Sequence, residues 1–243
     1  MNWHARYTQQ AGWTAGLRAY LFAGARLQAA RSALEVGCGT GAVLGEMEGP
    51  AVTHGLDISR EVLSEARLHA PRALLTCGDA GRLPYTDGRF GLTCCHYLLL
   101  WVRDPLQALE EMKRVTRRGG CVLAMAEPDY STRSDEPQAL VALGRLQRQA
   151  LIDQGADPDL GARLGELFAC AGIGIVETGL IAPPAAKAFD PAAWELEWAV
   201  LEADLAGRLP EAELLAYRQR DRQAWQDGER RLYVPTYYAW GQV

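Results

Sequence analysis

Five short apolar segments alternate with helix-patterned segments between residues 33 and 126, and this alternation limits the fold more than any other feature of the sequence. The apolar segments are Ala33–Gly37, Val52–Leu56, Ala73–Cys77, Leu92–Leu98 and Cys121–Ala126. Continuous apolar runs of this length are typical of strands that are buried on both faces of a parallel sheet. The sequence therefore predicts an α/β fold with a doubly wound, mostly parallel sheet.

The second half of the chain predicts two more strands and an inserted pair of helices. In chain order we expect helices at Pro137–Gln154 and Gly161–Ala171, a strand at Gly174–Ile181, helices at Asp190–Gly207 and Pro210–Asp227, and a last strand at Thr236–Gln242. The last two strands should form a hairpin-like pair at the end of the sheet. Residues 190–213 carry seven acidic residues and one basic residue, so an acidic, solvated surface is expected there.

This pattern divides the chain into four parts. They are an N-terminal helical segment 1–32, an α/β domain 33–183, a helical insertion 184–232, and a final strand 233–243 that completes the sheet.

Composition excludes several classes of protein. Hydrophobic residues make up 49% of the chain and charged residues 23%, which is ordinary for a globular protein and unlike a disordered or collagen-like chain. The uncharged run Cys94–Val102 is far shorter than the ~20 apolar residues of a membrane-spanning helix, and the N-terminus lacks a secretory pattern. We therefore expect a cytoplasmic protein without a membrane span.

Cysteine spacing, histidine spacing and net charge point to small-molecule chemistry. The six cysteines show no C-x-x-C spacing, which favours reduced thiols, and the four histidines lie in unrelated segments, so we expect no metal site. The formal net charge of −5 offers little attraction to phosphate backbones, which weighs against a nucleic-acid partner.

A glycine-rich loop follows the first predicted strand. In Leu34–Gly41 the strand is expected to end and a helix to begin, and the glycines allow a ligand to approach the backbone closely. Asp57 lies twenty residues after Gly37, at the tip of the second predicted strand, where a carboxylate can accept hydrogen bonds from both hydroxyls of a ribose. The sequence therefore predicts a site for an adenosine-containing cofactor.

The combined pattern of four segments resembles class I S-adenosylmethionine-dependent methyltransferases, and most of all the broad group that includes ubiquinone- and menaquinone-biosynthesis enzymes. The resemblance spans Leu34–Met125 and rests on Glu35–Gly41, Asp57, Gly78–Tyr85 and Arg118–Gly120. It implies a seven-stranded Rossmann-like methyltransferase fold, S-adenosyl-L-methionine as cofactor, and a small-molecule methyl acceptor. The chain departs from the group at Phe90–Gly91, where Phe-Asp is frequent, and at Arg117–Gly120, where Arg-Pro-Gly-Gly is frequent.

The resemblance also implies roles for particular residues. The methionine part of the cofactor is expected beside the loop residues Glu35, Gly37, Cys38 and Gly39, and near His96. The ribose and adenine are expected beside Asp57, Ile58, Asp79 and Ala80. A carboxylate at Glu35 suits a positively charged sulfonium, whereas it would repel the diphosphate of a dinucleotide.

Other candidate residues have a structural alternative. His96 is the first candidate for a general base, or it only donates or accepts a structural hydrogen bond. Asp129 and Tyr130 follow the fifth strand and could position the acceptor, although Pro128–Asp129 could equally form a turn. Tyr7 and Trp13 could close the N-terminal segment over the cofactor, or belong to a docking helix.

The aromatic stripe of the insertion has two interpretations as well. Trp194, Trp198, Leu201 and Leu205 recur at helical spacing, which is typical of a core-facing stripe. Alternatively, the insertion is a substrate cap whose aromatic residues wall the acceptor pocket.

The expected function is methyl transfer from S-adenosylmethionine to a small, partly apolar metabolite by in-line displacement, relying on positioning and exclusion of water. Two rivals remain open. Gly37-x-Gly39-x-x-Ala42 with Asp57 also fits a nicotinamide-dependent oxidoreductase, although no Tyr-x-x-x-Lys pair is present. The other rival is a non-catalytic S-adenosylmethionine-binding module.

Overall fold

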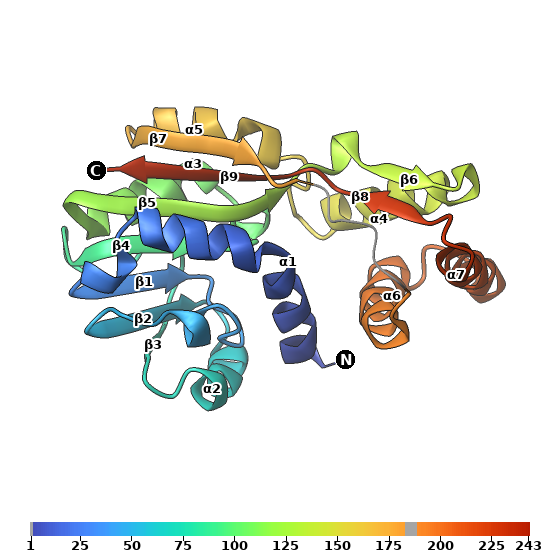
Figure 1. Cartoon of the computed structure of the whole chain (residues 1–243), viewed down its shortest axis with the longest axis horizontal. Helices are drawn as coiled ribbons and strands as arrows, with labels where there is room; N and C mark the ends of the chain where they lie inside the picture. Colours follow the sequence, from blue (N-terminus) through green and yellow to red (C-terminus); the bar gives the residue numbers. More distant parts are fainter. Residues whose placement is uncertain (1, 183–188) are drawn as a thin grey trace.

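A seven-stranded sheet forms one half of the protein (Figure 1). The computed structural model describes residues 2–182 and 189–243. The strand order is β3-β2-β1-β4-β5-β9-β7, and β9 runs antiparallel to both of its neighbours. The strands are β1 (Ser32–Val36), β2 (Val52–Asp57), β3 (Leu74–Cys77), β4 (Phe90–Cys95), β5 (Thr116–Pro128), β7 (Gly174–Leu180) and β9 (Thr236–Gln242). The predicted doubly wound, mostly parallel sheet and its terminal antiparallel pair are confirmed.

Helices cover both faces of this sheet. The sheet helices are α1 (Trp3–Gly24), α2 (Arg60–His69), α3 (Pro105–Val115) and α5 (Leu164–Cys170). Along β1, Leu34 packs into the core beneath α3 and α5, whereas its neighbour Ala33 packs into the core beneath α1. The same alternation is seen in β5, where Val122 and Leu123 belong to opposite cores. Burial on both faces explains why these strands contain apolar side chains at consecutive positions.

A second body, which we name the cap, lies beside the carboxyl ends of the strands (Figure 1). It consists of β6 (Ser134–Glu136), α4 (Val141–Asp153), α6 (Pro191–Leu205), α7 (Glu211–Gln226) and β8 (Arg231–Tyr233). The helices α4, α6 and α7 share an apolar core of their own, built from Leu140, Leu143, Ala150, Trp194, Trp198, Leu205 and Ala224. Part of the chain that precedes β7 thus belongs to the cap.

The cap is larger than the predicted insertion 184–232. It recruits β6 and α4 from the segment assigned to the α/β domain, because β6 pairs with β8 through the partners Asp135 and Leu232. Tyr233, expected in the final strand, lies in β8, and β9 begins at Thr236. The boundary predicted at residues 183 and 184 lies outside the described residues.

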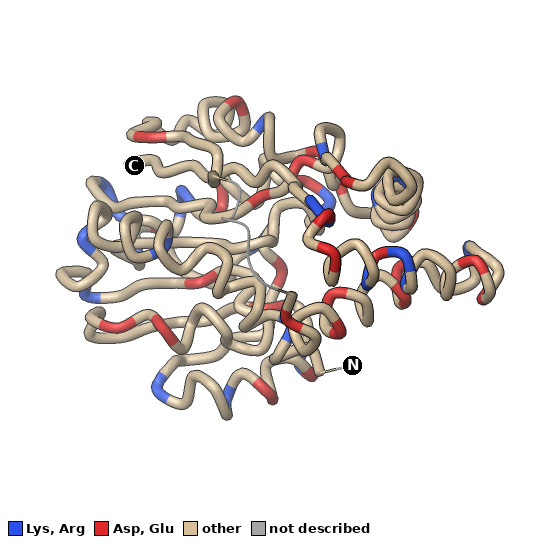
Figure 2. Tube along the Cα trace, turned by 45° about the vertical axis from the view of Figure 1, so that its right-hand side comes forward, with Lys and Arg blue, Asp and Glu red and all other residues tan. Residues whose placement is uncertain are grey.

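Two tryptophans of α6 form part of the cap core. Trp194 and Trp198 are 4% and 1% exposed, and both indole N–H groups donate to the carboxylate of Asp221 on α7, at 2.6 and 2.7 Å. The core interpretation of these residues is therefore right, and their assignment to a pocket wall is wrong. The acidic run around them is partly compensated, since Arg218 pairs with Glu195 and Glu202, and Figure 2 shows acidic and basic residues interspersed along the cap helices.

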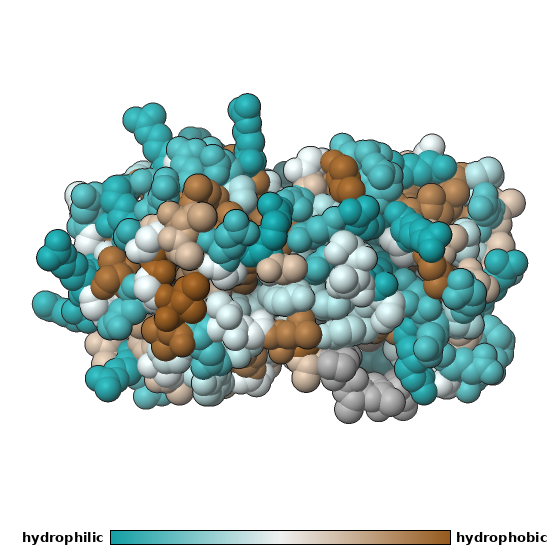
Figure 3. All heavy atoms as spheres, turned by 90° about the horizontal axis from the view of Figure 1, so that it is seen from above, coloured by the Kyte–Doolittle hydropathy of each residue, from teal (hydrophilic) through white to brown (hydrophobic). Residues whose placement is uncertain are grey.

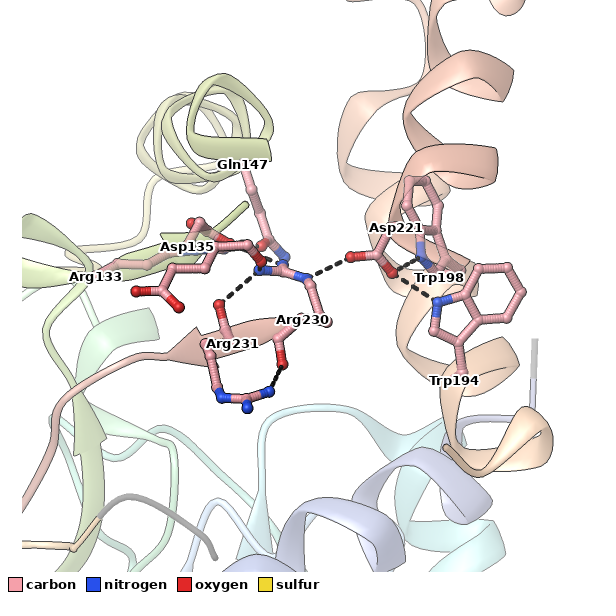
Figure 4. A network of polar contacts seen from close by, with 9 residues as sticks. Arg133, Asp135, Gln147, Trp194, Trp198, Asp221, Arg230 and Arg231 are labelled. Atoms are coloured by element: carbon pink, nitrogen blue, oxygen red, sulfur yellow. Dashed lines mark hydrogen bonds and ion pairs between the residues drawn. The ribbon is translucent and has the colours of Figure 1, made fainter. Parts of the chain in front are cut away.

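A network of buried charges continues from Asp221 (Figure 4). The other oxygen of Asp221 accepts from Arg230, whose guanidinium also reaches Asp135 on β6 at 2.8 Å. Asp135 in turn pairs with Arg133 at 2.7 Å. The two aspartates and two arginines balance in charge, and their side chains are between 2% and 6% exposed. This network fastens the two chain segments of the cap to each other.

The remaining elements are single 3₁₀ turns, η1 (Leu27–Ala29), η2 (Leu44–Glu46), η3 (Leu99–Trp101), η4 (Tyr130–Thr132), η5 (Gln138–Leu140) and η6 (Gly161–Arg163). The predicted helix Pro137–Gln154 comprises η5 and α4, and Gly161–Ala171 comprises η6 and α5. Figure 3 shows patches of apolar residues among polar ones on the face that includes the β7 edge, where Ile175, Val176 and Leu180 are exposed. Within residues 2–182 and 189–243, no helix is long and apolar enough to span a membrane.

Candidate functional site

The glycine loop lies where the strand order reverses, between the neighbouring strands β1 and β4. In open α/β sheets, ligands bind at the carboxyl ends of the strands beside such a reversal. Gly37 and Gly39 adopt φ values of +71° and +51°, which favour glycine. A Cβ on Gly37 would lie 2.6 Å from Cδ1 of Leu98, so a larger residue would also have to displace this side chain.

The loop does not open an α-helix, contrary to the prediction. Between β1 and β2 the chain forms only the short turn η2. The backbone N–H groups of Gly37 and Cys38 both donate to the carbonyl of Leu56, at 2.7 and 3.0 Å. The loop therefore lacks the helix N-terminus that binds a pyrophosphate in dinucleotide-binding proteins, and the N–H groups of its first two residues are already occupied.

Asp57 holds this loop in place. Its two carboxylate oxygens accept from the N–H groups of Gly39 and Ser59, each at 2.9 Å. The Ser59 hydroxyl in turn caps α2 by accepting from Val62 N–H. Asp57 thus organises both the loop and the start of α2, and each of its oxygens retains a second acceptor position. Its role as ribose ligand stays a prediction.

The expected adenine contacts lie on the two adjacent strand ends. Ile58 follows Asp57 and is 73% exposed, which is unusual for an isoleucine and leaves an apolar surface for a flat ring. Asp79, in the turn after β3, is exposed and accepts from Gly81 N–H at 2.8 Å. Ala80 beside it is buried. The fold brings these residues together at one edge of the sheet, because β3 pairs with β2.

Glu35 and Cys38 are buried beside the loop. Burial raises the pKa of Glu35 well above its ordinary value, against the opposing influence of Arg18. Its Oε2 atom is buried and accepts no hydrogen bond from the described residues. A cationic ligand group would complement that oxygen. The Cys38 side chain packs in the apolar core, and burial raises its pKa, so only the backbone of Cys38 is suited to ligand contact.

His96 makes a hydrogen bond to α1. Its Nε2 lies 2.9 Å from the hydroxyl oxygen of Thr14, and burial, together with the charge of Arg18, lowers its pKa to about 3. Such an imidazole is neutral at pH 7 and is a weak base. The geometry therefore favours the structural alternative for His96 over a general base.

His96 should make stability depend on pH. In the unfolded chain a histidine takes up a proton below about pH 6.5, whereas folded His96 does so only near pH 3. The stability present above pH 6.5 should therefore be lost as the pH falls toward 3. In urea unfolding from pH 7 to 4.5, the free energy of unfolding should fall more steeply for the wild type than for His96→Gln, by up to about 1.4 kcal/mol per pH unit. The same pH dependence of the free energy of unfolding in both proteins would contradict this assignment. A loss of stability in the variant that is equal at every pH would not affect the comparison of slopes.

Asp129 and Tyr130 differ in what they can do. Asp129 is 3% exposed, and one of its oxygens accepts from both the N–H and the hydroxyl of Ser131, at 2.9 and 2.5 Å. Asp129 therefore forms a turn, which was the alternative to a role in positioning the acceptor. Tyr130 is mostly buried against the cap, burial raises its pKa, and the guanidinium of Arg133 lies 5.8 Å from its ring centre.

The N-terminal helix contacts the loop through Tyr7. A Cβ on Gly39 would lie 3.3 Å from the Tyr7 ring, so this ring packs directly on the loop, as expected of a residue that closes over a cofactor. Trp13 is 45% exposed, and its ring stacks on the guanidinium of Arg6 at 4.8 Å. The structure therefore places Tyr7, and not Trp13, against the glycine loop.

Three residues at this edge were not predicted. Tyr97 directly follows His96 and has a φ of +52°, a strained backbone conformation that is often found at functional sites. Glu127 on β5 is fully buried, its carboxylate accepts from three consecutive backbone N–H groups of residues 98–100, and burial raises its pKa to about 7. Arg6 is buried in the same region. Positive φ and buried charge arise from tertiary structure, so no sequence pattern signals them.

Two of the histidines assigned to unrelated segments come together in the fold. Ligand atoms of His4, Glu65 and His69 lie within 4.8 Å of one another. However, the imidazole rings of His4 and His69 are stacked face to face, with their ring centres 3.3 Å apart. In addition, Nδ1 of His4 is hydrogen-bonded to the hydroxyl of Thr40 at 2.9 Å. Histidine coordinates metals through ring nitrogens at the ring edge. We therefore assign no metal to this cluster.

Known methyltransferases resemble this chain in sequence over the segment that contains the glycine loop. Residues 34–124 match a family model described as a methyltransferase domain. An uncharacterised 37.1 kDa protein of a Streptomyces fradiae transposon is 34% identical over 155 residues, covering 59% of this chain and 44% of that protein. A demethylmenaquinone methyltransferase from Halalkalibacterium halodurans is 36% identical over 108 residues, covering 41% of this chain and 44% of the enzyme.

A solved Bacillus halodurans structure of the methyltransferase type shares 17% sequence identity with a TM-score of 0.58, covering 87% of this chain and 91% of that one. This likeness concerns the fold. The chain spans about half the length of the curated relatives it matches. The sheet order and the matched segment together identify residues 34–124 as a methyltransferase domain, similar to the corresponding part of a demethylmenaquinone methyltransferase.

Proposed function

We propose that this protein transfers a methyl group from S-adenosylmethionine to a small, partly apolar acceptor. The observation that carries the proposal is the loop after β1: the N–H groups of Gly37, Cys38 and Gly39 are occupied by Leu56 and Asp57, and no α-helix begins at the loop. Such a loop suits a nucleoside without a diphosphate. The same observation disfavours a nicotinamide dinucleotide, for which an anion-binding helix N-terminus is expected.

The residues present fit the cofactor. Asp57 would hold the ribose, Ile58 and Ala80 the adenine, and the buried, unpartnered oxygen of Glu35 the cationic methionine end. Tyr7 would cover the loop from α1. When bound, the cofactor supplies a methyl group on a positively charged sulfur. The protein's part is to orient the two reactants and exclude water.

Two elements can exclude water from this edge. The N-terminal half of α1 reaches between α2 and α6 (Figure 1), and Gln9 donates to the carbonyl of Ala193 on α6 at 2.8 Å. The helix α1 thus joins the glycine loop to the cap. Because His96 is a weak base here, we propose positioning, and not proton abstraction by His96, as the main contribution to catalysis.

Ligand stabilisation tests the cofactor assignment. S-adenosylhomocysteine at about 100 times its dissociation constant should add about 2.7 kcal/mol to the free energy of unfolding. For a chain of this size, that corresponds to a rise in melting temperature on the order of 5–11 °C. NAD and NADP should leave the melting temperature unchanged. A shift with the dinucleotides and none with S-adenosylhomocysteine would overturn the proposed function.

A further inference from the structure

Arg6, on the N-terminal half of α1, is a buried arginine without an ion pair. It is 9% exposed, and its only side-chain hydrogen bond among the described residues goes from Nη1 to Gln9 Oε1, at 2.6 Å. Its Nε is buried and has no hydrogen-bond partner in residues 2–182 and 189–243. No carboxylate oxygen of the same residues lies within 4.0 Å of its guanidinium.

Other buried arginines of the described residues have carboxylate partners. Three more arginine side chains are at most 5% exposed, and each is paired with a carboxylate, as Arg18–Glu46, Arg133–Asp135, Arg230–Asp135 and Arg230–Asp221. An uncompensated buried charge is costly, and a guanidinium cannot escape the cost by losing its proton. An arginine in this state is best explained by an anion that binds there.

Arg6 lies on the side of the proposed site where the methyl acceptor is expected to bind. Arg6 precedes Tyr7, which packs on the glycine loop. The ionisable groups that face it, in order of their influence, are Glu197, Tyr130, Tyr97 and Asp204. Glu197 and Asp204 come from the cap, and Tyr97 and Tyr130 follow the carboxyl ends of β4 and β5, so Arg6 lies between the cofactor loop and the cap. The Trp13 ring covers one face of the guanidinium at 4.8 Å.

We propose that Arg6 binds a carboxylate of the methyl acceptor, with the hydroxyls of Tyr97 and Tyr130 as further donors. This inference rests on the proposed function and names the class of acceptor, an apolar or aromatic monocarboxylate. A carboxylate fits the planar fork of one guanidinium. A phosphate dianion fits less well, because Glu197 and Asp204 also face the site and repel two negative charges more strongly than one.

The ligand-free protein offers a first test. If Arg6 serves to bind an anionic ligand, Arg6→Met should leave the melting temperature of the ligand-free protein unchanged or raise it, because the variant removes an unpaired buried charge. Arg18→Met is the matched control and should lower the melting temperature, since Arg18 is paired with Glu46. A loss in Arg6→Met as large as that in Arg18→Met would assign Arg6 a structural role and overturn the proposal.

Matched acid and amide probes test the ligand class. With S-adenosylhomocysteine at saturation, phenylacetate and hexanoate should bind the wild type about tenfold or more tightly than phenylacetamide and hexanamide. In Arg6→Met this preference should fall to within about twofold. Arg67→Met, an exposed position on α2, should keep it. Ligand-observed NMR titration gives all four affinities.

The outcomes separate this inference from the proposed function. Acids that bind the wild type no better than their amides would overturn the carboxylate assignment, while the thermal shift with S-adenosylhomocysteine could still hold. A weaker affinity of Arg6→Met for S-adenosylhomocysteine itself would assign Arg6 to the cofactor's own carboxylate and would also overturn the proposal. The thermal shift in the wild type remains the separate test of methyltransferase function.

Discussion

Replacement of Asp221 by alanine should lower the free energy of unfolding by about 3–5 kcal/mol. The carboxylate of Asp221 accepts from two buried indoles, Trp194 and Trp198, and from Arg230. Its removal leaves two indole N–H groups without an acceptor and leaves Arg230 with one carboxylate in place of two (Figure 4). Breaking a buried pair is costly because the remaining charge stays desolvated. Urea unfolding followed by tryptophan fluorescence measures the effect.

Two further variants control for other causes. Asp227→Ala changes an aspartate at the end of the same helix whose side chain, among the described residues, accepts only from Gln223, and should have little effect. The double variant Asp221→Ala, Arg230→Met removes both partners and should be less destabilised than Asp221→Ala. A loss below about 1 kcal/mol in Asp221→Ala would mean that the network contributes little to the stability of the cap.

The sheet could be predicted from the sequence because its parallel strands contain short apolar segments that are bounded by turn residues. The last strand was placed at Thr236–Gln242, as observed. The small sheet of β6 and β8 could not be predicted, since each strand has only three residues and those of β6 are all polar. Their pairing joins positions about a hundred residues apart, so the extent of the cap follows only from tertiary contacts.

Part of the site could also be predicted, because some of its residues belong to a local sequence pattern. Gly37, Gly39 and Asp57 belong to a local pattern with fixed spacing, and in the structure Gly39 donates to Asp57 while Gly37 donates to the adjacent Leu56. The loop was wrongly expected to open a helix, because a glycine pattern specifies the turn and not the element that follows it. Arg6 and Tyr97 have no such pattern. Their significance lies in a missing ion pair and a positive φ, which exist only in the folded chain.

Asp57→Ala should weaken the binding of S-adenosylhomocysteine by about a hundredfold or more. Each charge-assisted hydrogen bond to a ribose hydroxyl contributes roughly 1.5–3 kcal/mol, and two such bonds would be lost. The variant also releases the Gly39 and Ser59 N–H groups, which loosens the glycine loop. The methyl-transfer rate at saturating cofactor should fall much less than the affinity, since Asp57 is expected to lie away from the transferring methyl.

A modified ligand separates the two effects of this variant. The 2′-deoxy analogue of S-adenosylhomocysteine lacks one of the hydroxyls that Asp57 is expected to hold. It should bind the wild type about tenfold or more weakly than the parent compound, and Asp57→Ala should hardly distinguish the two. Glu61→Ala, at an exposed position on α2, is the control and should bind like the wild type.

Calorimetric titration of S-adenosylhomocysteine into the wild type and into folded Asp57→Ala tests the account most directly. We predict one-to-one binding to the wild type, no binding of NAD, and a dissociation constant about a hundredfold higher or more in the variant. An unchanged dissociation constant in a variant that remains folded would show that Asp57 is not the ribose ligand. Binding of NAD by the wild type in place of S-adenosylhomocysteine would contradict the assignment of this site to methyl transfer.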